Sequence, residues 1–101
     1  MKKIVVAPGS FFKVLAGTAR SQVAEMVLQA GQTTGGPTNR HTDTDQWLYV
    51  VQGTGQAVVD EKKVNLKKGE LLLIEAGENH EIINSGKTPL KTLNFYSSPE
   101  F

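Results

Sequence analysis

Short apolar runs rich in β-branched and aromatic residues recur along the chain, and turn-forming residues separate them. The clearest runs cover residues 47–51, 57–59, 71–74 and 90–96. Ten glycines and four prolines are spread along the sequence rather than gathered in one linker. Short strands at such a spacing are typical of a sandwich or barrel. The pattern therefore predicts an all-β protein, with a charged hairpin tip at residues 60–63.

One segment, residues 21–30, fits two kinds of element. Val23, Met26 and Val27 lie on one stripe of a helix, whereas Met26 and Leu28 lie on one face of a strand. Periodicity alone does not decide between them. We expect a strand, because the rest of the chain is β and a lone amphipathic helix would need a second layer to cover its apolar face.

The composition is that of one globular domain covering residues 1–101. Apolar residues make up 39% of the chain and charged residues 21%, and the net charge is +1. This charge balance predicts neither a nucleic acid nor a membrane surface as partner, because both attract a clustered basic excess. The chain has no cysteine, which excludes disulfide scaffolds, thiolate metal sites and cysteine nucleophiles. Any imidazole chemistry must involve one of the two histidines, His41 and His80.

The first residues carry a faint likeness to a secretion signal. Residues 4–7 form an apolar run after two lysines, but Pro8 and Gly9 interrupt it too early for a signal peptide. We expect residues 4–7 to form an N-terminal strand and the protein to be cytoplasmic. No apolar run approaches the roughly 18 residues of a membrane-spanning helix.

The segment 69–84 places a histidine at the start of a predicted strand. A glycine opens an apolar strand, a turn around Gly77 follows, and His80 begins the next strand. Side chains alternate between the two faces of a strand, so His80, Ile82 and Asn84 share one face. This strand–turn–strand unit presents an imidazole beside a turn.

A second segment, 35–55, places polar side chains ahead of another predicted strand. Asn39 and His41 point the same way if the chain is extended, and Gln46 opens the strand. With the distant His80 they form a candidate metal constellation, provided that a barrel brings them together. A pair of histidines is more often two hydrogen-bonded structural residues than two ligands, so the spacing alone does not establish a metal site.

The two segments resemble the signature motifs of the cupin superfamily of small jelly-roll barrels. The second motif, over about 69–84, matches at every spacing, and only its proline is replaced, by Glu75. The first motif, over about 35–55, has Asn39 at its first histidine position and Gln46 at its glutamate position. The matched positions of the second motif are Gly69, Gly77, His80 and Asn84.

The resemblance covers most of the chain and implies a small single-domain cupin, folded as a double-stranded β-helix or jelly-roll barrel. It implies that His41 and His80 bind a divalent transition metal (zinc, nickel, iron, manganese or copper), with Asn39 and Gln46 completing the shell. These ligands bring no negative charge, so the ion would keep its full charge and favour an anionic partner. A second alignment keeps Asp43 as a reserve ligand.

Three functions are compatible with such a barrel. The first is a metal-dependent enzyme of dioxygenase, isomerase or decarboxylase type that acts on a small polar or anionic organic molecule. The second is a non-catalytic barrel that binds a sugar or organic acid, and the third is a metal-free barrel with an assembly role. The residues expected to line the cavity or pack in the core are Met26, Leu28, Phe95 and Tyr96.

A further expectation concerns the outside of the barrel. Trp47, Tyr49 and Val51 lie on the strand face opposite Gln46. A monomer would leave these apolar side chains in water, so we expect a homodimer.

Overall fold

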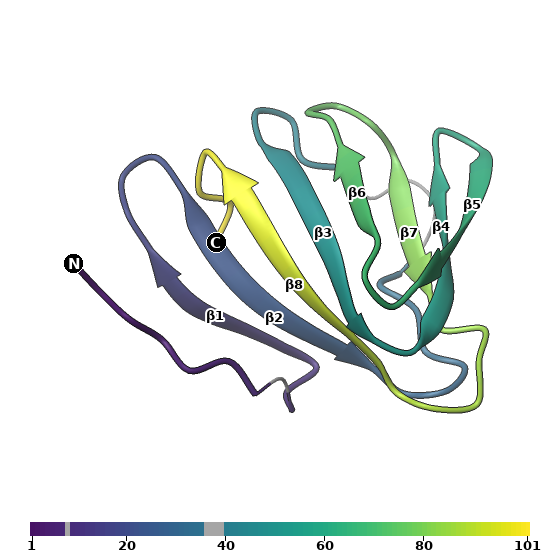
Figure 1. Cartoon of the computed structure of the whole chain (residues 1–101). Helices are drawn as coiled ribbons and strands as arrows, with labels where there is room; N and C mark the ends of the chain where they lie inside the picture. Colours follow the sequence, from purple (N-terminus) through teal and green to yellow (C-terminus); the bar gives the residue numbers. More distant parts are fainter. Residues whose placement is uncertain (8, 36–39) are drawn as a thin grey trace.

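The computed structural model describes residues 1–7, 9–35 and 40–101. The described residues form two antiparallel sheets, which are the two walls of one barrel in Figure 1. The strands are β1 (Phe12–Gly17), β2 (Gln22–Leu28), β3 (Asp45–Gln52), β4 (Thr54–Val59), β5 (Lys62–Lys67), β6 (Leu71–Ile74), β7 (His80–Ile83) and β8 (Leu90–Ser97). The larger sheet has the order β1-β2-β8-β3-β6 and the smaller one the order β5-β4-β7. The expected all-β jelly-roll barrel is confirmed.

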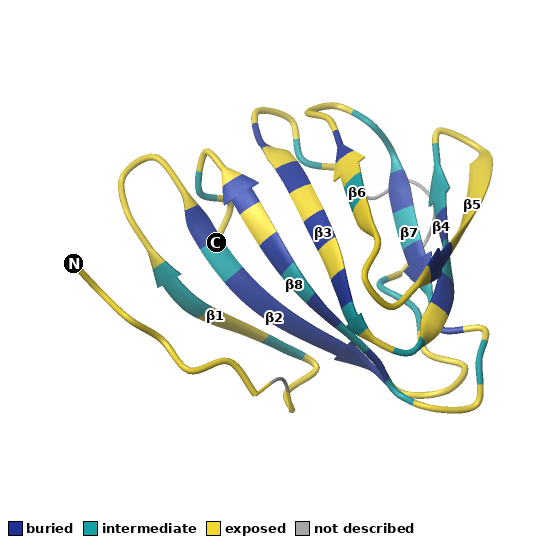
Figure 2. Ribbon diagram, in the orientation of Figure 1, coloured by how far each residue is buried: buried dark blue, intermediate teal, exposed yellow. Residues whose placement is uncertain are grey.

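Alternating burial explains why these segments are strands with one face inward. Along β3, Gln46, Leu48 and Val50 are buried, while Trp47 and Tyr49 between them are exposed, as the banding of Figure 2 shows. The inward side chains of both sheets meet in one core between the walls, as expected for a two-layer β fold. The buried members of this core are Met26, Leu28, Leu48, Val50, Ala57, Leu66, Ile74, Ile82 and Leu90.

The ambiguous segment 21–30 is the strand β2, as expected. Within β2, Gln22–Leu28, every residue except Val23 is buried, so both faces of the strand are covered rather than one. The carboxylate of Glu25, on the outward face of β2, accepts hydrogen bonds from the backbone N–H groups of Gly9 and Ser10. The segment before β1 therefore contacts this face. Burial on both faces removes the alternating pattern, and this is why the sequence also fits a helical stripe.

The expectation of a strand at residues 4–7 is wrong. These residues lie outside the strands, are exposed, and precede β1, which begins at Phe12. The hairpin tip expected at residues 60–63 is confirmed in shorter form, because Asp60 and Glu61 make the turn with positive φ angles and β5 starts directly afterwards. No helix among the described residues is long and apolar enough to cross a membrane.

Candidate functional site

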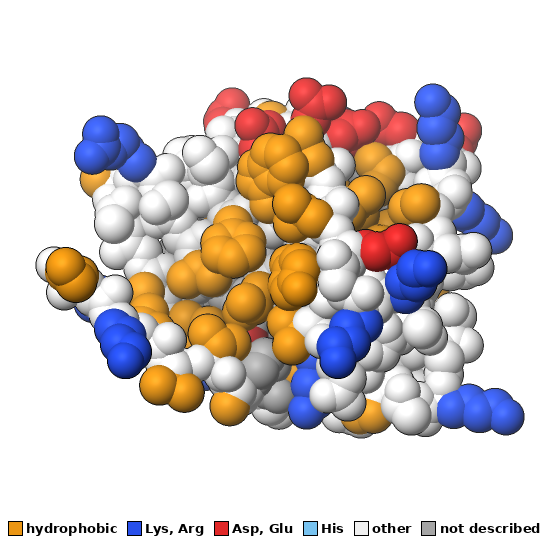
Figure 3. Space-filling view, viewed as in Figure 1, with side chains coloured by type: hydrophobic (Ala, Val, Ile, Leu, Met, Phe, Trp, Pro, Cys, Tyr) orange, Lys and Arg blue, Asp and Glu red, His pale blue; other side chains and the backbone are white. Residues whose placement is uncertain are grey.

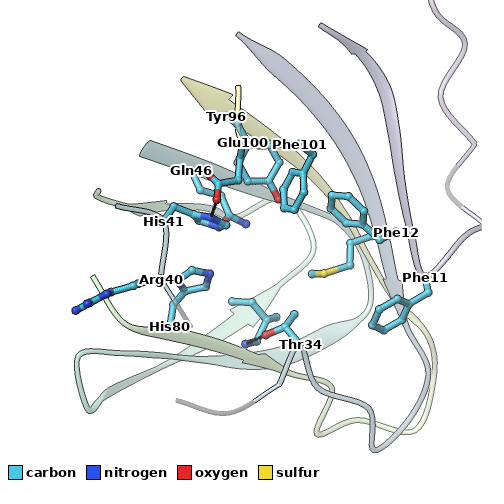
Figure 4. Close-up of a pocket in the computed structure, with 12 residues that line it drawn as sticks. Phe11, Phe12, Thr34, Arg40, His41, Gln46, His80, Tyr96, Glu100 and Phe101 are labelled. Atoms are coloured by element: carbon cyan, nitrogen blue, oxygen red, sulfur yellow. Dashed lines mark hydrogen bonds and ion pairs between the residues drawn. The ribbon is translucent and has the colours of Figure 1, made fainter. Parts of the chain in front are cut away.

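A cavity of about 330 Å³ lies inside the barrel, between the two walls (Figure 4). Its lining combines histidine, amide, carboxylate and guanidinium groups with several aromatic rings. The lining residues are Phe11, Phe12, Met26, Thr34, Arg40, His41, Gln46, His80, Ile82, Tyr96, Glu100 and Phe101.

Three of the side chains expected at the site meet in this cavity. Gln46 is the second residue of β3, His80 is the first residue of β7, and His41 lies in the loop before β3. The Nε2 atom of His41 lies 3.1 Å from the Oε1 atom of Gln46, and the ring centroids of His41 and His80 are 4.9 Å apart. The two motifs are also joined by backbone, because the N–H of Gly77 donates to the carbonyl of His41 at 2.7 Å.

Among the described residues, no other expected ligand joins this cluster. Asn39 lies outside the described residues. Asp43 is described, is exposed, and is not among the residues that line the cavity.

His80 is held in one orientation by its own turn. Its Nδ1 atom lies 3.3 Å from the carbonyl oxygen of Glu78, and a carbonyl only accepts, so Nδ1 carries the proton. The Nε2 atom is then an acceptor. Burial lowers the pKa of His80, the nearby charge of His41 lowers it further, and the bond to Glu78 opposes both. His80 is thus kept in the neutral form that a metal ligand needs.

Glu100 is a site residue that the sequence did not indicate. Its Oε1 atom lies 3.0 Å from Nδ1 of His41, and its side chain is 30% exposed. The tail that carries it is fixed by Gln22, whose Oε1 atom accepts from the backbone N–H groups of Glu100 and Phe101 at 3.1 Å and 2.9 Å. The Phe101 ring packs against Phe12 and Tyr96, with centroids 4.7 Å and 5.2 Å apart. The tail therefore forms one wall of the cavity.

The structure separates the residues expected to line the cavity or pack in the core, and it corrects the expectation for Phe95 alone. Met26 does line the cavity, but Leu28 is fully buried in the core and is not among the lining residues. Phe95 lies on the outer face of β8 and is 42% exposed, because it alternates with the inward-facing Asn94 and Tyr96. Tyr96 lines the cavity, as expected, and burial raises the pKa of its phenol well above the usual value.

The side chains present fit a divalent metal. Within residues 1–7, 9–35 and 40–101 no group of three or more His, Cys, Asp or Glu side chains could hold an ion, so a metal site here needs an amide oxygen as donor. Two neighbouring ligand atoms, each about 2.1 Å from one ion, lie roughly 3 Å apart when they subtend a right angle. The 3.1 Å between Nε2 of His41 and Oε1 of Gln46 is close to this spacing and is also an ordinary hydrogen-bond distance, so the pair can be joined by a proton or by an ion.

The hydrogen bonds behind the two histidines also fit. A histidine that binds a metal usually donates its other ring N–H to a carboxylate or a backbone carbonyl. His41 faces the Glu100 carboxylate in this way, and His80 faces the Glu78 carbonyl. When Nδ1 carries the only ring proton of His41, toward Glu100, Nε2 and the Gln46 oxygen are two acceptors 3.1 Å apart. A cation between them would then take the place of the proton that otherwise joins them.

The outer face of the larger sheet carries a second feature, an apolar patch. Trp47 pairs in register with Leu73 on β6 and Phe95 on β8, and Tyr49 pairs with Leu71. All five side chains are exposed, and Figure 3 shows hydrophobic side chains gathered over β8, β3 and β6. The face expected to form a dimer interface is therefore apolar and open.

The model of one protein family matches most of the chain. The family is described as "Cupin domain", and the match covers residues 24–96. The uncharacterised protein MJ1618 of Methanocaldococcus jannaschii is 30% identical over 74 residues, covering 73% of this chain and 58% of that protein. The tetracenomycin polyketide synthase protein TcmJ of Streptomyces glaucescens is 32% identical over 59 residues, covering 58% of this chain and 39% of that protein. The chain thus spans about half the length of the curated relatives that it matches.

Solved structures with the same architecture are similar over most of the chain. BH2720 from Bacillus halodurans has a TM-score of 0.86 and 28% identity, covering 91% of this chain and 73% of that one. KdgF from Halomonas sp. has a TM-score of 0.80 and 21% identity, covering 88% of this chain and 78% of that one. At this identity the similarity indicates only a shared fold. A predicted oxalate decarboxylase from Thermotoga maritima has a TM-score of 0.71 and 28% identity, covering 77% and 66%.

Proposed function

This chain belongs to the cupin family, and within that family we propose that it is a metal-dependent protein whose site acts on a small polar or anionic organic molecule. The observation that carries the proposal is the meeting of His41, Gln46 and His80 in one cavity, with the hydrogen-bond partners that metal-binding histidines use.

The metal would be held by Nε2 of His41, Oε1 of Gln46 and the ring of His80, with Asn39 as the fourth ligand that the family motif implies. A divalent transition metal in such a site supplies a Lewis acid that polarises an oxygen of the bound molecule.

The chain's own residues supply the remaining parts of the site. Phe12, Phe101 and Tyr96 form an aromatic wall that excludes water, and Glu100 holds the imidazole of His41 in place. A neutral ligand set leaves the positive charge of the ion uncompensated, and Arg40 adds another cationic group to the lining. Both favour an anionic molecule.

The size of the cavity and one relative support the same class of ligand. About 330 Å³ lies at the small end of ligand pockets, which suits a compact organic molecule rather than a polymer. One structural neighbour with 28% identity is described as a predicted oxalate decarboxylase, and oxalate is a small dianion. We therefore place small carboxylic acids first among the ligands to screen.

A second candidate function is a non-catalytic barrel that binds a sugar or organic acid. The observation that favours it is the state of Glu100, the carboxylate that lines the cavity. It already pairs with His41, and a paired carboxylate is a weaker general base than a free one. The two candidates differ in turnover, since a binder returns its ligand unchanged.

The metal is tested by elemental analysis of tag-free protein, comparing the wild type with the double variant His41→Ala, His80→Ala. We expect close to one transition-metal ion per wild-type chain and a near-complete loss in the variant. Asp43→Ala is the matched control and should keep the metal. Equal and negligible metal in the wild type and the double variant would contradict the proposal. Loss of the metal in Asp43→Ala would instead support the second alignment of the first motif, in which Asp43 is a ligand.

Turnover separates the enzyme from the binder. Metal-loaded wild-type protein is incubated with a panel of small carboxylic acids and sugars, and each compound is followed by one-dimensional NMR. Product that forms with the wild type but not with the double variant supports the enzyme. A compound that binds in the cavity and is recovered unchanged after long incubation supports the non-catalytic barrel.

A further inference from the structure

A chain of buried hydrogen bonds runs from the cavity into the larger sheet. Gln46 donates from Nε2 to Oδ1 of Asn94 at 2.9 Å, and Asn94 donates from Nδ2 to Oγ1 of Thr92 at 3.1 Å. Thr92 then donates its hydroxyl hydrogen to the backbone carbonyl of Met26 at 3.2 Å. Asn94 and Thr92 are fully buried and Gln46 is 4% exposed, so water does not compete for these bonds.

The last member of the chain sets the direction of every bond in it. The carbonyl of Met26 can only accept, so the Thr92 hydroxyl uses its single hydrogen there and must accept from Asn94. Asn94 therefore turns its NH₂ group toward Thr92 and its oxygen toward Gln46. Gln46 must then donate its own NH₂ group to Asn94, which leaves its oxygen facing His41 in the cavity.

We propose that Thr92 and Asn94 are positioning residues, which act through the amide of Gln46 to present its oxygen rather than its nitrogen to the cavity. The proposal rests on the proposed function, because an amide oxygen can bind a metal ion and an amide NH₂ group cannot. The two atoms of the Gln46 amide thus have separate tasks. The nitrogen anchors the side chain to β8, and the oxygen serves as a ligand.

The same chain of hydrogen bonds gives a physical reason for glutamine at position 46. A glutamate there would place a second acceptor against Oδ1 of Asn94, and two acceptors at hydrogen-bond distance repel. Asn94 would have to turn its amide over and Thr92 would have to donate to it, so the carbonyl of Met26 would lose its bond. Gln46 and Asn94 are therefore matched partners within this barrel.

The test compares two variants of Thr92 that differ in the hydroxyl. Thr92→Val keeps the shape but removes the hydroxyl, so nothing fixes which way the Asn94 amide points. Thr92→Ser keeps the hydroxyl and should restore the direction of the chain. The first readout is the affinity for Co²⁺, titrated into the metal-free protein. We expect the Co²⁺ affinity of Thr92→Val to fall about 10-fold, which is within the range seen when residues that orient metal ligands by hydrogen bonds are removed. Thr92→Ser should bind Co²⁺ about as tightly as the wild type.

The second readout needs no metal. In the wild type, nuclear Overhauser effects from the side-chain NH₂ protons of Gln46 should reach Asn94 and not the ring of His41. In Thr92→Val, a set of cross-peaks to the His41 ring should appear, and in Thr92→Ser it should not. A loss of stability without reorientation would leave this pattern unchanged.

Each result has a distinct meaning. Thr92→Val with wild-type Co²⁺ affinity and wild-type cross-peaks would overturn the positioning role. If Thr92→Val does not fold, the wild-type spectrum still decides, because cross-peaks from the Gln46 NH₂ group to the His41 ring would contradict the proposal. If the wild type shows the expected cross-peaks but binds no Co²⁺, the positioning role holds and the proposed metal function fails.

Discussion

Replacement of Glu100 by alanine is the most informative perturbation of the site outside the two motifs. Glu100 does not touch the proposed metal, but its carboxylate lies 3.0 Å from Nδ1 of His41. Without it, the proton of His41 is free to move to Nε2, the atom that faces Gln46. The variant should therefore weaken metal binding without removing any ligand.

The expected size follows from the exposure of the pair. Loss of a group that orients a metal-binding histidine costs about 10–100-fold in metal affinity. Glu100 is 30% exposed and His41 14% exposed, so water replaces part of the lost bond and the lower end applies. We expect about a 10-fold loss, which corresponds to about 1.4 kcal/mol.

The assay is calorimetric titration of Zn²⁺ into metal-free protein. Glu61→Gln is the control, since it removes the same charge from an exposed turn outside the cavity. It should bind Zn²⁺ as the wild type does, and a thermal melt should show that Glu100→Ala is folded. Zn²⁺ affinity of Glu100→Ala within twofold of the wild type would refute the reasoning.

Three further predictions concern the fold and its surface. Trp47→Glu puts a charge in the apolar outer patch, so we expect it to convert a dimer into a monomer by analytical ultracentrifugation; a wild type that is already monomeric would contradict the dimer. Leu48→Ala empties a fully buried core position and should cost about 2–5 kcal/mol in urea unfolding, whereas a cost below 1 kcal/mol would mean a loosely packed core. The backbone hydrogen bonds from Ser10 and Gly9 hold the pKa of Glu25 in the folded protein below its usual 4.5. The ionised carboxylate therefore stabilises the fold above pH 4.5. This contribution is lost as the pH falls through the lowered pKa of the folded state. Glu25→Gln should therefore lose less stability than the wild type on acidification below pH 4.5, and parallel curves would contradict this.

The second motif could be predicted from the sequence almost completely. Its spacing placed His80 at the start of a strand, and β7 begins at that residue. The alternation rule put His80, Ile82 and Asn84 on one face, and all three are buried. Local geometry decides these positions, because a tight turn and a period of two act within a few residues.

Other parts of the site depend on contacts that no local pattern encodes. Glu100 reaches His41 only because Gln22, far away in the sequence, fixes the backbone of the tail. Asn94 and Thr92 lie on a strand whose alternation predicts that they are buried but not which atoms they bond. Phe95 shows the same limit. The apolar run predicts the strand β8, but it does not predict that Phe95 lies on the outer face of that strand.

The central claim is that one cation site lies between His41, Gln46 and His80. The most direct test is anomalous diffraction from crystals of the protein grown with Zn²⁺ and measured on both sides of the zinc absorption edge. The account predicts an anomalous peak within bonding distance of Nε2 of His41 and Oε1 of Gln46, with His80 beside it. A structure without a peak at these atoms, or with the peak at Asp43, would contradict it.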